Sequence, residues 1–235
     1  CIEYAKKYPD LIRLFLHKRE NNRKVLGKPC GIFQIMYNTY QLRGRYVAGL
    51  SGDDYWTSNL KLMKQSNLLK TSKDLSFVYT PYRSAILINN KRVLGDIKKS
   101  FPKASSVMYL NKFELLPQEF IETLNEDVFF QSISRMYGKV AIVDKSGLTV
   151  YNTDASNIWN SNNNFDKNMH RANLNKCLWL AFRNSYRKFE INLSDTIVNY
   201  KDKNKIGLSF KWFIKNANFR LYYFTFRSLI KSIIK

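Results

Sequence analysis

Cysteine is scarce in this chain of 235 residues, and its few thiols are far apart. They stand at Cys1, Cys30 and Cys177, an odd number without any Cys-x-x-Cys spacing. This pattern argues against a disulfide-stabilised fold and against a structural zinc site. We therefore expect reduced thiols in a cytosolic protein.

Long apolar runs are also missing. No stretch of about eighteen apolar residues occurs, so the sequence predicts no transmembrane helix. There is no signal-peptide pattern and no internal repeat, and we find neither a zinc finger nor an RNP-type RNA-binding motif. An integral membrane protein and the common nucleic-acid-binding modules are therefore disfavoured.

Acidic residues are few beside basic ones. The chain has 18 Asp and Glu against 39 Lys and Arg, which gives a formal net charge of +21. A nucleic acid, an anionic membrane surface and an anionic substrate are all consistent partners. Hydrophobic residues make up 45% and aromatic residues 15%, as in a folded protein. The length suits one domain with a helical extension.

The most informative stretch runs from residue 44 to residue 65. It predicts a short apolar strand over residues 46–50, then Ser51, Asp53 and Asp54 in a loop, then a helix that opens near Trp56. Adjacent carboxylates at the carboxyl end of a strand lie where open α/β sheets hold ligands. Their oxygens suit a hard divalent cation that partners a diphosphate. The alternative is that these two acids cap the helix and complement its dipole.

This stretch resembles the segment around the acidic metal-binding motif of family 2 glycosyltransferases, which have the GT-A fold. The matching residues are Gly44, Arg45, Tyr46, Val47, Ala48, Gly52, Asp53, Asp54, Tyr55, Trp56, Lys61, Leu62 and Gln65. The resemblance implies that Asp53 and Asp54 bind the metal and, with Ser51, the nucleotide sugar. Ser51 departs from the family, which usually has Asp at that position.

A second similar stretch covers residues 125–151. It predicts a helix that is capped around Asn125 and runs to Tyr137, a stop at Gly138, and strands over 139–144 and 147–151. In the family, an acidic residue at the start of this helix is the catalytic base. The resemblance gives that role to Asp127, with Glu126 as the second candidate; the alternative is an ordinary first-turn acid. Tyr151-Asn152-Thr153-Asp154 replaces the Arg-x-His pattern common in the family.

The resemblance implies an α/β fold, namely a GT-A type, Rossmann-like mixed sheet flanked by helices and lacking its first strands. Residues 1–160 would form the catalytic domain and residues 161–235 a basic helical extension. Similar enzymes have two further strands ahead of the helical pattern at residues 2–8, so we expect an N-terminally truncated chain. The implied reaction is inverting transfer of a sugar from a nucleotide-sugar donor to a glycan or lipid-linked acceptor, in cell-surface polysaccharide or lipopolysaccharide synthesis. It would use Mn²⁺ or Mg²⁺.

Two tryptophans are candidates for contact with the sugar or the acceptor. Trp56 and Trp159 have rings that stack well on sugars, although a core position is the commoner fate of Trp. We expect Ser156 to Asn168 to form a turn-rich boundary or an acceptor loop.

The remaining elements follow from apolar periodicity. We expect strands over 11–16, 75–79, 85–88 and 105–110, and a loop with a strand fragment over 91–104. Helices are expected over 32–42, 111–116, 168–189, 194–200 and 209–235. A helix from Thr57 or Ser58 to Leu69 should pack on the sheet through its apolar positions, Leu60, Met63, Leu68 and Leu69.

The last 35 residues favour membrane contact. Residues 201–235 hold nine Lys or Arg and one acid, Asp202, which gives +8 and suits an anionic bilayer. We therefore expect a cytoplasmic protein, peripheral on the inner face of the membrane, that binds no nucleic acid. Two alternatives stay open. One is a basic nucleic-acid-binding protein, and the other is an inert membrane-associated fragment.

Overall fold

The computed structural model describes residues 1–25, 28–89, 91–99, 102–113, 116–124, 126–153 and 164–182. Its α-helices are α1 (Ile2–Lys7), α2 (Ile32–Tyr40), α3 (Lys61–Thr71), α4 (Glu126–Tyr137) and α6 (Asn164–Ala181). Short 3₁₀ helices are η1 (Arg19–Asn21), η2 (Ala104–Ser106) and η3 (Gln118–Glu122). The strands are β1 (Arg23–Val25), β2 (Lys28–Cys30), β3 (Tyr46–Ala48), β4 (Tyr55–Trp56), β5 (Leu75–Tyr79), β6 (Tyr82–Ile88), β7 (Lys91–Lys98), β8 (Val107–Leu110), β9 (Lys139–Ile142) and β10 (Thr149–Asn152). The chain therefore has a mixed α/β fold, as expected.

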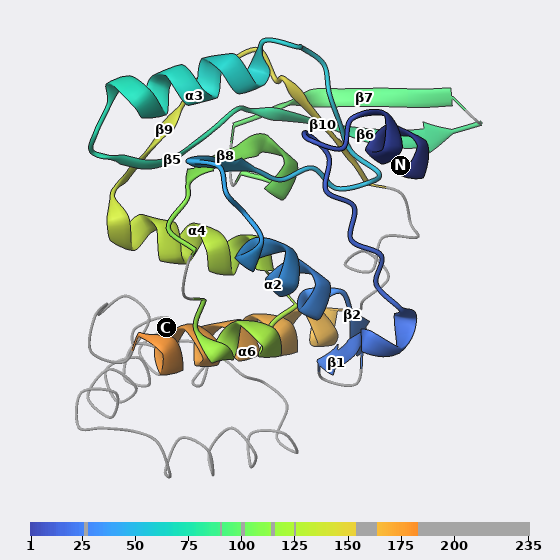
Figure 1. The fold of residues 1–235 in the computed structure, drawn as a ribbon, viewed down its shortest axis with the longest axis vertical. Coiled ribbons are helices and arrows are strands. Elements are labelled where there is room, and N and C mark those ends of the chain that lie inside the picture. Colours follow the sequence, from blue (N-terminus) through green and yellow to red (C-terminus); the bar gives the residue numbers. More distant parts are fainter. Residues whose placement is uncertain are drawn as a thin grey trace, which may run out of the picture.

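The first of two four-stranded sheets forms the centre of the molecule (Figure 1). Its order is β3-β8-β5-β9, with β8 antiparallel to both of its neighbours and β9 parallel to β5. Helix α3 packs on one face of this sheet, α4 packs on the other, and α6 contacts α4 and η3. The carboxyl end of β3 leads directly into the acidic loop, so this sheet positions the candidate site.

Successive residues of β5 and β8 point to opposite faces of the sheet. Phe77 and Tyr109 belong to the large core under α4 and α6, which also contains Phe129 and Trp179. Val78 and Met108, their neighbours in sequence, pack with Leu69 of α3 in a smaller core. Burial on both faces explains why these strands read as continuous apolar runs in the sequence.

The second sheet has the order β4-β10-β6-β7. Strand β10 is parallel to β6 and antiparallel to β4, and β6 forms an antiparallel hairpin with β7. This hairpin extends beyond the other elements at the right of Figure 1. Strands β1 and β2 form a separate small hairpin.

The expected strand over residues 11–16 is wrong. These residues are all described and form no strand, and Leu11 and Leu16 are 83% and 76% exposed. Side chains hold the segment on α2 instead, because the Arg13 guanidinium donates to the carbonyl oxygen and the side-chain Oε1 of Gln41, at 2.8 and 2.9 Å. Apolar alternation predicts a strand only where a neighbouring strand completes the backbone hydrogen bonds.

Helix α3 packs on the sheet with only part of the expected set of residues. Leu69 is buried and Leu68 packs beside it, as expected, but Leu60 and Met63 are 45% and 51% exposed. Lys61 and Gln65 are buried in their place. Lys61, Gln65 and Leu69 form the buried side of the helix. These three residues recur every four positions and so lie on one side of the helix. The polar members are buried because Lys61 donates to Gln65, and the Gln65 amide donates to the Ser106 carbonyl of η2.

Four expected elements differ from the structure. Residues 55–56 form β4 instead of opening a helix. Residues 91–98 form the full strand β7, where only a strand fragment within a loop was expected. The strand expected over 105–110 is confirmed only from Val107, because η2 occupies residues 104–106. The helix expected over 168–189 corresponds to α6, which begins at Asn164 and ends at Ala181.

Several expectations lie outside the described residues. They concern Asn125, the loop around Trp159, the helices over 194–200 and 209–235, and part of the helix expected over 111–116, whose described residues 111–113 are irregular.

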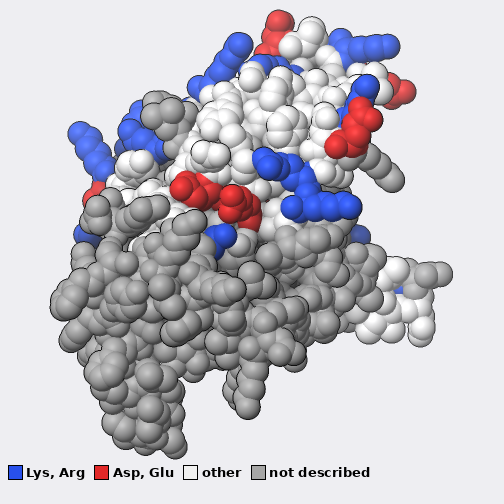
Figure 2. Space-filling view, turned by 90° about the horizontal axis from the view of Figure 1, so that it is seen from below, with Lys and Arg blue, Asp and Glu red and all other residues white. Residues whose placement is uncertain are grey.

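Basic side chains are distributed over the described surface. Figure 2 shows Lys and Arg spread across one face, with acidic side chains in small groups between them. None of the described helices has the length and apolar character needed to cross a membrane.

Candidate functional site

Asp54 anchors the loop that follows β3. This residue is only 8% exposed. The Ser105 hydroxyl donates to its Oδ2 at 2.6 Å, and the Asn152 backbone N–H donates to its Oδ1 at 3.0 Å. Burial raises the pKa of the Asp54 carboxyl, while these two hydrogen bonds lower it. Asp54 therefore joins the loop to the end of β10 and to η2.

Asp53 and Ser51 lie on the exposed side of the same loop. The Asn152 side-chain amide donates to the Asp53 carbonyl oxygen, and the Ser51 N–H donates to Ser105 Oγ at 3.0 Å. These bonds hold the backbone and leave the Asp53 carboxylate directed to solvent. Asp53 is consequently the acid of the pair that is placed to meet a ligand.

The oxygen donors of this loop suit a hard cation, although they do not form a complete protein site. Mg²⁺ is usually held by one or two carboxylates together with water and substrate phosphates. Asp53 and the remaining lone pairs of Asp54 fit that donor set, and Ser51 adds at most a hydroxyl. Across the described ranges, no three His, Cys, Asp or Glu side chains come close enough to hold a metal ion. A cation here would therefore need oxygens from its ligand.

Asp127 and Glu126 open helix α4, as the sequence predicts. Asp127 Oδ1 accepts the Val128 N–H at 2.8 Å. Burial raises the pKa of both carboxyls; that of Glu126 reaches about 7, with the Asp127 charge as the second cause. A carboxyl that titrates near neutral pH is suited to proton transfer.

Lys103 links the two groups of acids. Its positive charge lowers the pKa of both Asp54 and Asp127, so its ammonium lies within electrostatic reach of each. The ammonium sits over the Tyr151 ring at 4.4 Å and makes no ion pair with a carboxylate among the described residues. Gln131, one turn after Asp127, donates to the Pro102 carbonyl at 3.1 Å and holds α4 against this segment. The loop after β3 and the start of α4 thus border one region.

Trp56 has structural partners on its ring and on its indole nitrogen. The indole N–H donates to the Ser105 carbonyl at 2.8 Å, and the Lys61 ammonium lies 4.4 Å from the ring centre. Lys61 also donates to Gln65 Oε1 at 2.8 Å, and burial lowers its pKa from 10.5 to about 8. Together, Trp56, Lys61 and Gln65 support the 105–106 backbone on which Asp54 depends.

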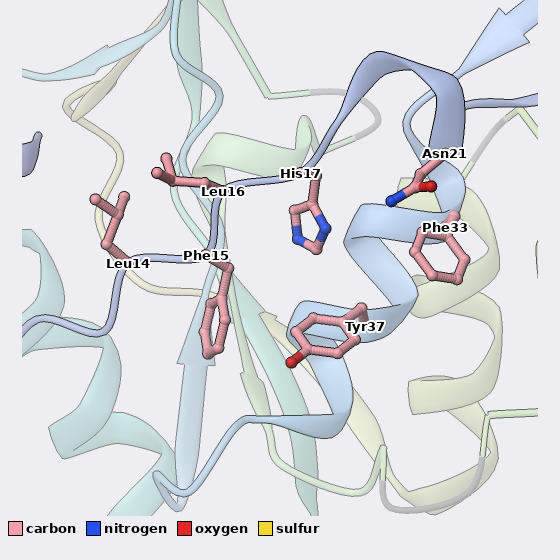
Figure 3. A pocket seen from close by; sticks show the side chains of 7 residues that line it. All are labelled: Leu14, Phe15, Leu16, His17, Asn21, Phe33 and Tyr37. Atoms are coloured by element: carbon pink, nitrogen blue, oxygen red, sulfur yellow. The ribbon is translucent and has the colours of Figure 1, made fainter.

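A separate aromatic cavity of about 370 Å³ lies between the extended segment 14–17 and helix α2 (Figure 3). The His17 ring packs edge-on against Tyr37 at 5.3 Å, and Phe15 does so at 5.4 Å. The cavity shares no lining residue with the acidic loop or with the start of α4. The contacts of His17 are those of a packed surface residue.

The structure brings some of the predicted site residues together and adds others. Ser51, Asp53 and Asp54 share one loop, and Lys103 connects that loop electrostatically to Asp127 and so to the start of α4. Lys103 and Ser105 were missed, because nothing in the local sequence links them to the acids. Asn152 could have been suspected from the sequence, because it lies in the segment that replaces the Arg-x-His pattern of the family. Trp159 lies outside the described residues.

Comparison with known proteins adds relatives but no established activity. No model of a protein family matches the chain. It is 27% identical over 177 residues to uncharacterized proteins of Mycobacterium tuberculosis (strains H37Rv and CDC 1551) and Mycobacterium bovis. The matched region covers 68% of this chain and 47% of each relative. The chain therefore spans about half the length of the curated relatives it matches.

Proposed function

We propose that this protein is a glycosyltransferase of GT-A type that moves a sugar from a nucleotide-sugar donor to a hydroxyl of a glycan or lipid-linked acceptor. The observation that carries the proposal is the pairing of two acidic positions across Lys103. Asp53 and Asp54 follow a central strand, and Asp127 starts a helix whose first turns are held against the Pro102–Ser105 segment. Glycosyl transfer needs these two functions, one at the leaving diphosphate and one at the acceptor hydroxyl.

The acceptor side of the reaction falls to Asp127. The acceptor oxygen attacks the anomeric carbon from the face opposite the diphosphate, the bond from that carbon to the diphosphate oxygen breaks, and the configuration inverts. The hydroxyl proton passes to the Asp127 carboxylate, and the bonding electrons leave with the diphosphate. The developing positive charge on the sugar is the one met in glycoside hydrolysis. Glu126 is the second candidate for the base, since its pKa of about 7 suits proton transfer.

The donor side falls to the loop after β3. Asp53, with Asp54, would hold Mn²⁺ or Mg²⁺, which neutralises charge on a leaving diphosphate when bound. The Lys103 ammonium is available to the same anion, because its partner within the described part of the chain is an aromatic ring and no carboxylate. Asn152 fixes the loop backbone so that Asp53 points outward.

Release of nucleoside diphosphate from a panel of sugar nucleotides tests the proposal. The assay runs with and without Mn²⁺ or Mg²⁺, in the presence of a membrane extract that supplies acceptors. We expect metal-dependent release that falls at least about a hundredfold in Asp127→Asn, as for loss of a general base. Asp53→Asn should raise the metal concentration needed for half-maximal rate.

Asp74→Asn is the matched control, since it also removes one acid but changes only an exposed ion pair with Lys139. It should release diphosphate at the parental rate. Metal-independent release, or full activity in Asp127→Asn, would contradict the assigned roles. No release from any donor would contradict the proposed function itself.

A further inference from the structure

The outer half of the β6–β7 hairpin exposes a group of aliphatic side chains. Each keeps between 44% and 54% of its surface accessible, and together we call them the hairpin patch: Ile86, Leu87, Ile88, Val93 and Leu94. Strand register places Ile86 opposite Val93 and Leu87 opposite Arg92. The end of the hairpin is the exposed turn at Asn89, whose φ is 49°.

The hairpin patch covers both faces of the hairpin. Consecutive strand residues point to opposite faces, so Ile86 and Ile88 lie on one side and Leu87 on the other. An antiparallel sheet with one face in water normally carries polar side chains on that face. Contiguous apolar surface of this kind indicates a contact with a partner or a membrane.

The charge around the hairpin patch is positive. Residues 82–98 contain Arg83, Lys91, Arg92 and Lys98 against a single acid, Asp96. Lys91 is next to the turn and makes no ion pair with any described residue, while the Arg92 guanidinium lies 5.2 Å from the Tyr55 ring centre. Aliphatic side chains flanked by Lys and Arg suit the headgroup region of an anionic bilayer.

A second copy of the chain fits the hairpin patch less well than an anionic membrane does. Each copy carries a formal charge of +21, so two hairpins would approach against mutual repulsion. Lysines at both ends of β7 also disfavour pairing of that edge strand with its counterpart.

We propose that the β6–β7 hairpin contacts the surface of an anionic membrane, with the hairpin patch at the level of the headgroups and Lys91 and Arg92 at the lipid phosphates. This contact does not depend on the proposed transferase activity. It concerns residues of the described chain, far in sequence from the basic segment 201–235.

Sedimentation with vesicles tests the proposal without any sugar donor. The vesicles are phosphatidylcholine alone or phosphatidylcholine mixed with phosphatidylglycerol. We expect binding only to the mixed vesicles, and partitioning weaker by about tenfold or more in the Ile86→Ser/Ile88→Ser double variant, since it loses two half-exposed aliphatic side chains. The net charge of this variant is unchanged.

Leu60→Ser/Met63→Ser is the matched control, because these α3 side chains are 45% and 51% exposed and removing them also leaves the charge unchanged. It should bind like the parent protein, and circular dichroism should show both double variants folded. Parental binding by the hairpin variant, equal losses in both variants, or no binding of the parent to mixed vesicles would overturn the proposal. A solution dimer that only the hairpin substitutions dissolve, with vesicle binding unchanged, would assign the hairpin patch to a second copy instead.

Discussion

At the scale of single residues, the acidic loop depends on a serine that does no chemistry of its own. Ser105 Oγ donates to Asp54 and accepts from the Ser51 N–H, and its carbonyl oxygen accepts from Trp56. Three residues of the 51–56 stretch are thus held by one residue in a 3₁₀ turn. The serine combines a donor and an acceptor in one small side chain, which no apolar residue of that size replaces.

Ser105→Ala should therefore weaken the fold around the site. We expect the free energy of unfolding to fall by about 2 kcal/mol, because a buried carboxylate and a backbone N–H each lose a partner. The loss should be larger at neutral pH than at acid pH, since the Ser105 hydrogen bond lowers the pKa of Asp54 and so favours its ionised form. Urea unfolding measures the difference.

Ser66→Ala is the comparison for that experiment. The Ser66 hydroxyl donates only to the Met63 carbonyl on the exposed side of α3, at 3.1 Å. Its removal should change the free energy of unfolding by less than about 0.5 kcal/mol. Equal losses at the two serines would show that Ser105 has no special place in the site.

Lys61 gives the protein a measurable pH dependence. Its pKa is about 8 in the folded chain and 10.5 ordinarily, so unfolding takes up a proton between these pH values. The free energy of unfolding should therefore rise with pH across this window, by up to about 3 kcal/mol. The Lys61→Met variant should lack this pH dependence of the free energy of unfolding. Below pH 8 it should also be spared the cost of burying a charged ammonium. Guanidinium unfolding of both proteins from pH 7 to pH 10 checks the difference; parallel curves would contradict it.

Lys103 should set the acidic limb of the pH profile of the proposed transferase reaction, in which Asp127 is the proposed base. Its charge lowers the pKa of Asp127, so Lys103→Gln raises that pKa and keeps the base protonated to higher pH. We expect the acidic limb of kcat/KM to move upward in the variant. Lys73→Gln, which removes an exposed charge, should leave the profile in place.

Sequence reasoning named the acids of the candidate site but not the residues that support them. Asp53, Asp54 and Asp127 were predicted from the strand, loop and helix patterns around them and from the resemblance to family 2 glycosyltransferases. Ser105 and Lys103 were not, because their roles depend on the return of β8 and η2 beside β3, a pairing between residues far apart in the chain. Nothing local in a sequence reports such a contact.

At the scale of elements, the junction from α4 to β9 has no spare room. A methyl group at Gly138 would lie 2.6 Å from the Asp74 carbonyl oxygen and 3.1 Å from the Ser76 nitrogen. Both neighbours are backbone atoms at the start of β5, which pairs with β9. Relief would require the two parallel strands to separate.

Gly138→Ala should consequently lower the free energy of unfolding by about 2 to 3 kcal/mol, as overpacking against backbone does. Thermal or urea unfolding measures the loss. Gly52→Ala is the paired substitution, since a methyl group there would meet nothing within 4 Å. It should have little effect, and a similar loss at both glycines would contradict the steric explanation.

Element prediction succeeded where apolar periodicity and packing agree. Strand β5 has the expected bounds, and α4 ends at the expected Tyr137. It failed where a contact with a distant part of the chain decides whether a segment forms a strand or which side of a helix is buried. The apolar segment 11–16 has no strand beside it among the described residues, and the basic residues 91–98 form a full strand because β6 pairs with them. On α3, Leu68 and Leu69 were correctly expected to face the sheet. Lys61 and Gln65 were missed because their burial depends on the hydrogen bond between them.

At the scale of the whole molecule, an excess of positive charge opposes compaction. The whole chain has a formal charge of +21. On the face that Figure 2 shows, described Lys and Arg side chains are spread out with few acidic groups between them. Salt screens this repulsion, because the Debye length falls from about 14 Å at 0.05 M to about 4 Å at 0.5 M. We expect the melting temperature to rise by about 2 to 5 °C over that range. Differential scanning calorimetry in NaCl tests this, with sucrose as the uncharged comparison, and a fall with NaCl would contradict it.

The three thiols differ in exposure, so they should react with a thiol reagent at different rates. Cys1 is exposed, Cys30 is partly buried, and Cys177 is fully enclosed in the core beneath α6, where burial raises its pKa to about 12. A thiol reagent should modify Cys1 within the mixing time and Cys177 only when the α6 contacts open. The rate of the slowest modification then reports how often the large core opens, and it does so without any substitution in the chain.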